Sequence, residues 1–172
     1  MKIWSGLALS MLTALFAFSS SADEVNGTLG VKLIITNGCA VNGGGVTASS
    51  PDMGELDFGS TATLSQNINA EAVSTTAGAL QIQCTKALPY NILIGAGLHD
   101  QGTQRYMANG SELISYNLYQ DTGRNTQWNN TATVAKTATG AQENLSIYGQ
   151  VPPQDVPNAG TYTDTVQVTV SW

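Results

Sequence analysis

Two long stretches, one near each end of the chain, alternate apolar and polar side chains as half-buried β-strands do. The first runs from Val25 to Thr36 and the second from Thr161 to Trp172. The apolar face of the second stretch carries Tyr162, Val166, Val168, Val170 and Trp172. A β-sandwich with an apolar strand at its end leaves a sheet edge to which another chain can add. The pattern favours a β-fold that assembles head to tail with copies of itself.

The rest of the chain predicts further short strands and no helix. Charged residues are only 10% of the 172, so the Glu, Lys and Arg that favour helices are scarce. The candidate strands, separated by Gly, Asn and Pro, are residues 29–36, 54–58, 63–73, 79–85, 90–96, 112–120, 145–151 and 161–172. Asn109-Gly110-Ser111 suits a hairpin turn, and residues 131–140 suit a loop or a weak edge strand. Many short alternating strands indicate an all-β, antiparallel sandwich.

Residues 1–22 read as a secretory signal peptide. Lys2 supplies the positive charge, a mostly apolar run follows, and the small residues Ser20-Ser21-Ala22 suit cleavage before Asp23. A membrane anchor or a buried helix is the alternative, but the apolar run is short against the ~20 residues of a membrane span. We expect an exported protein whose mature part, residues 23–172, is one domain.

The charge of the mature part argues against a nucleic-acid partner. Lys2 is one of the six basic residues, so five remain against twelve acidic residues, a formal charge of −7. The five are scattered and form no run, whereas binding to a phosphate backbone needs clustered Lys and Arg.

Cys39 and Cys84 are the only cysteines. An even count in an exported chain predicts one disulfide. A loop of this length would stabilise the fold by roughly 4 kcal/mol in the chain-entropy model. A redox or metal pair is the alternative, and neither cysteine lies in a C-x-x-C motif.

No convincing catalytic, metal or cofactor site emerges. His99, the sole histidine, lies in a Gly-rich loop, and the chain has no G-x-S-x-G motif to complete a triad. The acidic residues Asp52, Glu55 and Asp57 lack the spacing of a Ca²⁺ loop. Gly43-Gly44-Gly45 lacks the lysine of a phosphate-binding loop. Trp128 in an Asn-rich loop suits either sugar binding or packing. We expect no enzyme.

The first alternating stretch allows two interpretations. Val25 to Thr36 would span roughly 40 Å if fully extended at ~3.3 Å per residue, longer than an ordinary strand. It is either one long first strand of its own domain, or a divided segment. In the second case residues near 33–36 begin the domain, and the earlier part reaches into a neighbouring molecule.

Several ordered motifs carry a resemblance that covers essentially the whole mature chain. They are residues 30–39 (GVKLIITNGC), 54–59 (GELDFG), 80–84 (LQIQC), 114–119 (ISYNLY) and 160–170 (GTYTDTVQVTV). In these motifs the chain resembles the spore coat protein U domain family, which includes subunits of archaic chaperone–usher pili of the Csu type. The resemblance implies an incomplete immunoglobulin-like antiparallel β-sandwich that is completed by a donor strand, a form of β-strand addition for which chaperone–pilin complexes are an established case.

The resemblance also assigns roles to residues. The donor segment, about residues 23–33, would contribute Val25, Gly27, Leu29, Val31 and Leu33. The edge of the acceptor groove would include Val166, Val168 and Val170.

The function implied is a structural pilus subunit on the cell surface that supports adhesion and biofilm formation. Its partners would be a periplasmic chaperone, an outer-membrane usher, other pilus subunits and copies of itself. The alternatives are a tip or minor pilin, a secreted module that binds a receptor or carbohydrate, and a spore or cyst coat protein.

Overall fold

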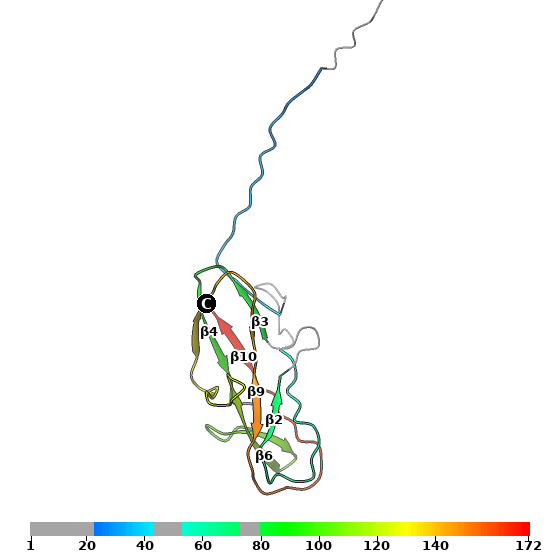
Figure 1. Ribbon diagram of the computed structural model, residues 1–172. Helices are drawn as coiled ribbons and strands as arrows, with labels where there is room; N and C mark the ends of the chain where they lie inside the picture. The colour runs from blue at the N-terminus through cyan, green and yellow to red at the C-terminus, as the bar shows by residue number, and fades with distance from the viewer. Residues whose placement is uncertain (1–22, 43–52, 73–79) are drawn as a thin grey trace, which may run out of the picture. The chain divides into compact units, whose positions relative to one another are not determined.

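A computed structural model describes residues 23–42, 53–72 and 80–172. Its contacts divide the chain into two units, residues 1–34 and 35–172. The described part of the first unit, residues 23–34, contains no helix and no strand, and its side chains are exposed. Figure 1 draws it as an extended trace. The predicted signal peptide lies outside the described residues.

Among its described residues, the second unit contains ten strands and no helix. The strands are β1 (Cys39–Val41), β2 (Ile68–Glu71), β3 (Leu80–Cys84), β4 (Pro89–Ile94), β5 (Arg105–Asn109), β6 (Glu112–Tyr119), β7 (Val134–Thr137), β8 (Glu143–Leu145), β9 (Tyr148–Val151) and β10 (Val168–Ser171). They form three antiparallel sheets in the orders β1-β3-β8, β10-β4-β7 and β2-β9-β6-β5. Figure 1 shows β10 beside β4 and β2 beside β9. The described residues form no helix, and therefore no helix that could span a membrane.

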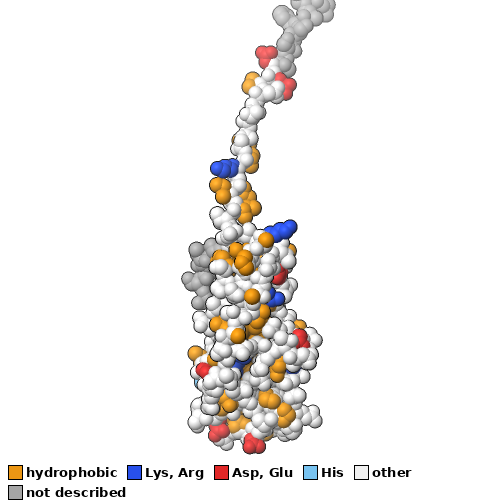
Figure 2. All heavy atoms as spheres, turned by 90° about the vertical axis from the view of Figure 1, so that its left-hand side faces the viewer, with side chains coloured by type: hydrophobic (Ala, Val, Ile, Leu, Met, Phe, Trp, Pro, Cys, Tyr) orange, Lys and Arg blue, Asp and Glu red, His pale blue; other side chains and the backbone are white. Residues whose placement is uncertain are grey.

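One apolar core lies between the sheets. Alternation supplies it: in β4 the inward positions are Tyr90, Ile92 and Ile94, and all three are fully buried. Tyr116 and Leu118 of β6 face the same core from another sheet. The expectation of an all-β antiparallel sandwich of the immunoglobulin type is therefore confirmed. Figure 2 shows few charged side chains on the face it displays, in keeping with the low charge content.

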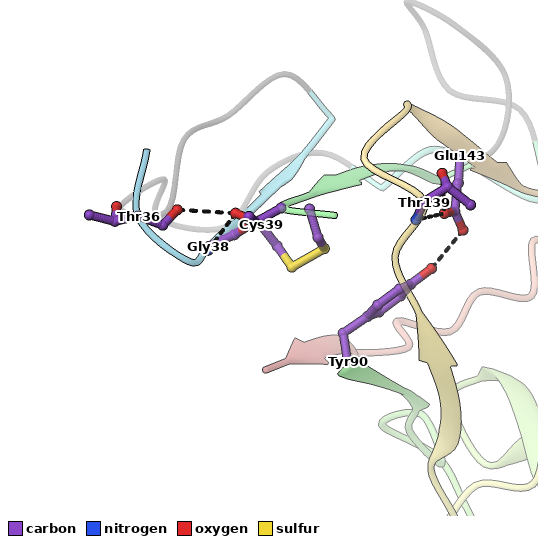
Figure 3. Close-up of a disulfide and its surroundings, with 8 residues drawn as sticks. Thr36, Gly38, Cys39, Tyr90, Thr139 and Glu143 are labelled. Carbon is purple, nitrogen blue, oxygen red and sulfur yellow. Dashed lines mark hydrogen bonds between the residues drawn. A yellow bond between two sulfur atoms is a disulfide. The ribbon is translucent and has the colours of Figure 1, made fainter. Parts of the chain in front are cut away.

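The cysteine prediction is also confirmed. Cys39 in β1 and Cys84 in β3 are directly opposed in the strand register and form a disulfide. Figure 3 shows this bond. The hydroxyl of Thr85, the residue after Cys84, donates a 3.0 Å hydrogen bond to the carbonyl of Thr36. The disulfide and this hydrogen bond fasten the start of the second unit to β3.

Most predicted strands are present, with shifted ends. The Asn109-Gly110-Ser111 turn joins β5 to β6, with Asn109 opposite Glu112. Gly110 alone carries the positive φ, 60°, at the first central position, as in a type II′ turn. Residues 134–137 form the edge strand β7.

Several expected strands are missing or much shortened. Residues 29–36 form no strand, residues 54–58 belong to none of the ten, and residues 161–167 precede β10 without joining it. A strand exists through hydrogen bonds to a neighbouring strand. The segment 29–36 has no such neighbour among the described residues, and the other two segments border an open groove.

Candidate functional site

An apolar groove runs through the second unit. Its volume is about 920 Å³, and its two borders are residues 53–64 and residues 156–166. The apolar floor is built by side chains from five strands and one loop: Ile68, Ile94, Met107, Ile114, Tyr116, Leu118, Ile147 and Val151. Most of these belong to, or pack against, the core of the sandwich, so the groove opens the core to the outside.

Each border of the groove presents an alternating row of side chains. On the first, Leu56 and Phe58 pack against the core, while Glu55 and Asp57 are exposed. Phe58 meets Tyr116 edge to face, with ring centroids 6.2 Å apart. On the second border, Tyr162 and every second residue to Val170 are half-buried, and the residues between them are exposed. The alternation predicted from the sequence is therefore present even where no strand forms.

The predicted groove-edge residues do not all lie in the groove. Val166 and Val168 line it, and both remain only partly buried. Val170 does not line it and lies opposite Ile92 in the pairing of β10 with β4. In the sheet order of the described residues β10 is an outer strand, so one of its edges is free of another strand. Trp172, expected on the inward face, is half exposed.

A buried carboxylate lies in the second border. Asp164 stands on the same face as the apolar residues, and its side chain is 3% exposed. The hydroxyl of Tyr116 donates to its Oδ2 at 2.6 Å. The backbone N–H of Leu98 donates to its Oδ1 at 2.9 Å, and Nδ1 of His99 lies 3.1 Å from the same oxygen. His99 is an exposed loop residue, as the sequence indicated, and it also has a carboxylate partner.

Burial around this carboxylate changes the chemistry of its neighbours. Burial raises the pKa of Tyr116, and the hydrogen bond to Asp164 raises it further, so the phenol stays protonated. Arg105, opposite Tyr116 in the strand register, is 1% exposed, and burial lowers its pKa. Its guanidinium donates to the carbonyl oxygens of Ile94, Gly95 and Trp128 at 2.7, 2.8 and 2.9 Å. These three hydrogen bonds hold Arg105 to the end of β4 and to the backbone at Trp128.

The predicted donor residues lie in the other unit. Val25 is 95% exposed and Leu29 and Val31 are each 89% exposed, with Leu33 close behind. A Cβ added at Gly27 would meet no atom within 4 Å. A free aliphatic side chain in water costs about 1.5–3 kcal/mol relative to a buried one. Burial of this row of side chains against an apolar surface would therefore be strongly favourable.

The other candidate sites give no chemistry in the described part of the chain. No three His, Cys, Asp or Glu side chains in residues 23–42, 53–72 and 80–172 could together hold a metal ion. Asp52 and Gly43-Gly44-Gly45 lie outside those residues. Trp128 is buried in the core, so its ring is not available for a sugar.

A family model, a relative and a solved structure show what this chain is similar to. The family model of the Spore Coat Protein U domain matches residues 25–169. Protein U of Myxococcus xanthus is 29% identical over 177 residues, which cover 96% of this chain and 95% of that protein. A chain in the crystal structure of the CsuC–CsuE chaperone–tip adhesion subunit pre-assembly complex, from archaic chaperone–usher Csu pili of Acinetobacter baumannii, is 22% identical with a TM-score of 0.49, and the match covers 80% of this chain and 40% of that one. Since the family model matches residues 25–169 of the 172, the chain belongs to the Spore Coat Protein U domain family.

Proposed function

We propose that this chain is a structural subunit of a cell-surface pilus and polymerises head to tail by donor-strand exchange. The observation that carries the proposal is a complementary pair within one chain. The second unit has an apolar groove bordered by two segments outside its sheets. The first unit has an alternating row of exposed aliphatic side chains outside any fold.

The row and the groove match in chemistry. The donor residues Val25, Leu29, Val31 and Leu33 lie at alternate positions, with Gly27 in the gap, so an extended chain turns them all to one face. The groove floor is apolar, and β10 offers a free edge for backbone pairing. Burying four aliphatic side chains would contribute roughly 6–12 kcal/mol before the entropy of association is subtracted.

The geometry of the exchange would produce a fibre. Donor and acceptor are different surfaces of the same chain, so each subunit would fill its neighbour and leave its own groove for the next. Such heterologous contacts give an open filament when they do not close into a ring. This supports surface attachment and biofilm formation as the biological role of the polymer, with no catalytic step.

An open groove also explains why two accessory partners would be required. An unfilled apolar groove with a free strand edge invites aggregation. A periplasmic chaperone would lend a strand to the exported subunit, and an outer-membrane usher would exchange it for the donor segment of the next subunit. Residues 1–22 would direct the export.

The family suggests a second candidate. The match to Protein U covers 95% of that relative, and the family is named after a spore coat protein. A spore or cyst coat built from the same exchange would need the same donor and groove. Electron microscopy of the purified polymer would separate the two, since a pilus gives thin fibres and a coat gives layers.

The test compares purified full chains on a denaturing gel, unheated and heated. Leu29→Asp or Val31→Asp puts a charge on the apolar row, and we expect the unheated ladder of the wild type to disappear. Thr28→Asp adds the same charge to the opposite, polar face and should keep the ladder. A variant without residues 23–31 should give monomer only.

Two results would contradict the proposal. Normal ladders from Leu29→Asp would remove the donor assignment. A wild type that is monomeric with a cooperative melt would indicate a self-complete domain, and the function would shift to a secreted or tip module that contacts a receptor directly.

A further inference from the structure

The chain along the C-terminal border of the groove is hydrogen-bonded first to one sheet and then to another. Thr163 exchanges two backbone hydrogen bonds with Ala108 of β5, at 2.9 and 3.1 Å. Four residues later, the carbonyl of Gln167 accepts a 2.8 Å hydrogen bond from Gly95, at the end of β4. The chain between these two anchors crosses from one sheet to another and belongs to no strand.

Asp164 fixes this crossing. Among the described residues that line the groove, it is the one charged side chain that is buried, and it joins the crossing to two other elements. One carboxylate oxygen binds the hydroxyl of Tyr116 in β6, and the other binds the backbone of Leu98 and the ring of His99. Hydrogen bonds to a carboxylate are about twice as strong as neutral ones.

The backbone around the carboxylate is shaped to admit it. Gly97 has φ +93° and lies so close to the Asp164 carboxylate that a Cβ there would collide with Oδ2. Gly95 lies close to the backbone at the end of the crossing, since a Cβ there would come within 3.2 Å of the Gln167 carbonyl oxygen. Arg105 supplies a buried positive charge whose field reaches both Tyr116 and Asp164.

We propose that Asp164 is a positioning residue for donor-strand acceptance. It holds residues 163–167 at the distance from residues 53–64 that leaves room for one added strand, the donor segment of a second copy of this chain. This inference rests on the proposed function. Without the carboxylate, the crossing has no attachment to β6 between its anchors at Thr163 and Gln167, and the groove loses its preset width.

The test measures donor binding by a full chain that accepts but does not donate. Leu29→Asp in the full chain disables its own donor segment and leaves its groove unchanged. A fluorescent synthetic peptide of residues 23–36 is titrated against this parent. Asp164→Asn and Tyr116→Phe are each added to the parent, and melting temperature is measured beside peptide affinity.

Tyr90→Phe is the matched control. It removes another buried tyrosine–carboxylate hydrogen bond, 2.9 Å to Glu143, and neither residue lines the groove. We expect peptide affinity to fall about tenfold or more in Asp164→Asn and in Tyr116→Phe, on the scale of one charged hydrogen bond. Tyr90→Phe should lower the melting temperature without lowering the affinity for the peptide.

The outcomes separate the two proposals. A parent that does not bind the peptide contradicts donor-strand exchange itself. A parent that binds, with unchanged affinity in both Asp164→Asn and Tyr116→Phe, contradicts the positioning role and leaves the exchange intact. Equal loss of affinity in Tyr90→Phe would show that general stability, not groove position, sets the affinity. If Asp164→Asn does not fold, Tyr116→Phe alone decides.

Discussion

The hydroxyl of Tyr90 in β4 donates a 2.9 Å hydrogen bond to the carboxylate of Glu143 in β8, and so joins two of the three sheets. The same carboxylate accepts hydrogen bonds from the backbone N–H and the hydroxyl of Thr139, at 3.1 and 3.0 Å. Figure 3 shows these side chains close to the disulfide. The small sheet β1-β3-β8 is thus tied to the rest of the sandwich by a polar contact as well as by its core residues.

This contact predicts a loss of stability at alkaline pH. Burial, and then the hydrogen bond to Glu143, raise the pKa of Tyr90 to about 12. An unfolded tyrosine titrates near 10, so the folded protein holds this proton more tightly. The stabilisation is complete below about pH 10 and is lost as the pH rises toward 12. The free energy of unfolding should fall by on the order of 1–2 kcal/mol over that range. Urea titrations at several pH values measure this fall. The free energy of unfolding of Tyr90→Phe should fall less over the same range.

Glu143 predicts the opposite dependence in acid. The backbone N–H of Thr139, followed by the hydroxyl of Tyr90, lowers the pKa of this carboxyl below its ordinary value. The stabilisation is therefore present above the ordinary pKa, about 4.3, and is lost as the pH falls through the folded value. Melting temperatures from neutral pH down to about pH 3 measure the loss. A Glu143→Gln variant should be less sensitive to acid, and equal sensitivity would contradict the assignment.

Removing the disulfide should cost stability in the subunit. Cys39→Ser or Cys84→Ser opens a loop between residues separated by 45 positions. The chain-entropy model gives a loss of roughly 4 kcal/mol. The denaturation midpoint in urea measures this, and wild type treated with a reductant should match either variant. A midpoint that does not move would mean that the bond constrains little.

The sequence predicted the parts of the fold whose residues alternate regularly. β3, β4 and β6 each present apolar side chains at every second position to the core, and all three were predicted. β5 was missed because its buried residues, Arg105 and Ala108, are three positions apart and one of them is charged. The strand therefore shows no regular alternation of apolar and polar residues. β1 was missed because it is three residues long and owes its place to the disulfide and to pairing with β3.

The groove was predictable only as a consequence of the end segments. The face of Val166 and Val168 could be read from alternation, but the floor is assembled from strands far apart in sequence. Asp164 lies two positions before Val166, so its place on the same face was predictable from the sequence. Its partners were not, because Leu98 contributes a backbone group and Tyr116 lies 48 positions away.

Arg105 is predicted to be worth more to stability than the more exposed Arg124. Arg105→Met leaves three carbonyl oxygens without their buried donor, and the loss should be about 3 kcal/mol or more. Arg124 donates to Ala70 and Gly149 near the surface, where water can replace it, so Arg124→Met should cost about 1 kcal/mol. Urea denaturation of the two variants gives the comparison, and equal losses would contradict the difference in burial.

Gly149 gives a way to move the first border of the groove without touching the second. It lies in β9 beneath Leu56 and Phe58, and a Cβ at this position would come within 2.7 Å of the Leu56 side chain and 2.8 Å of the Phe58 ring. Gly149→Ala must therefore push these side chains outward, at a cost of about 1–3 kcal/mol, the usual range for overpacking. Since Leu56 and Phe58 line the groove, the donor peptide should bind more weakly than the loss of stability explains. Peptide titration beside Tyr90→Phe, which is destabilised elsewhere, makes the comparison. A Gly149→Ala protein that melts lower but binds the peptide as tightly as its parent would show that residues 53–64 do not contact the donor.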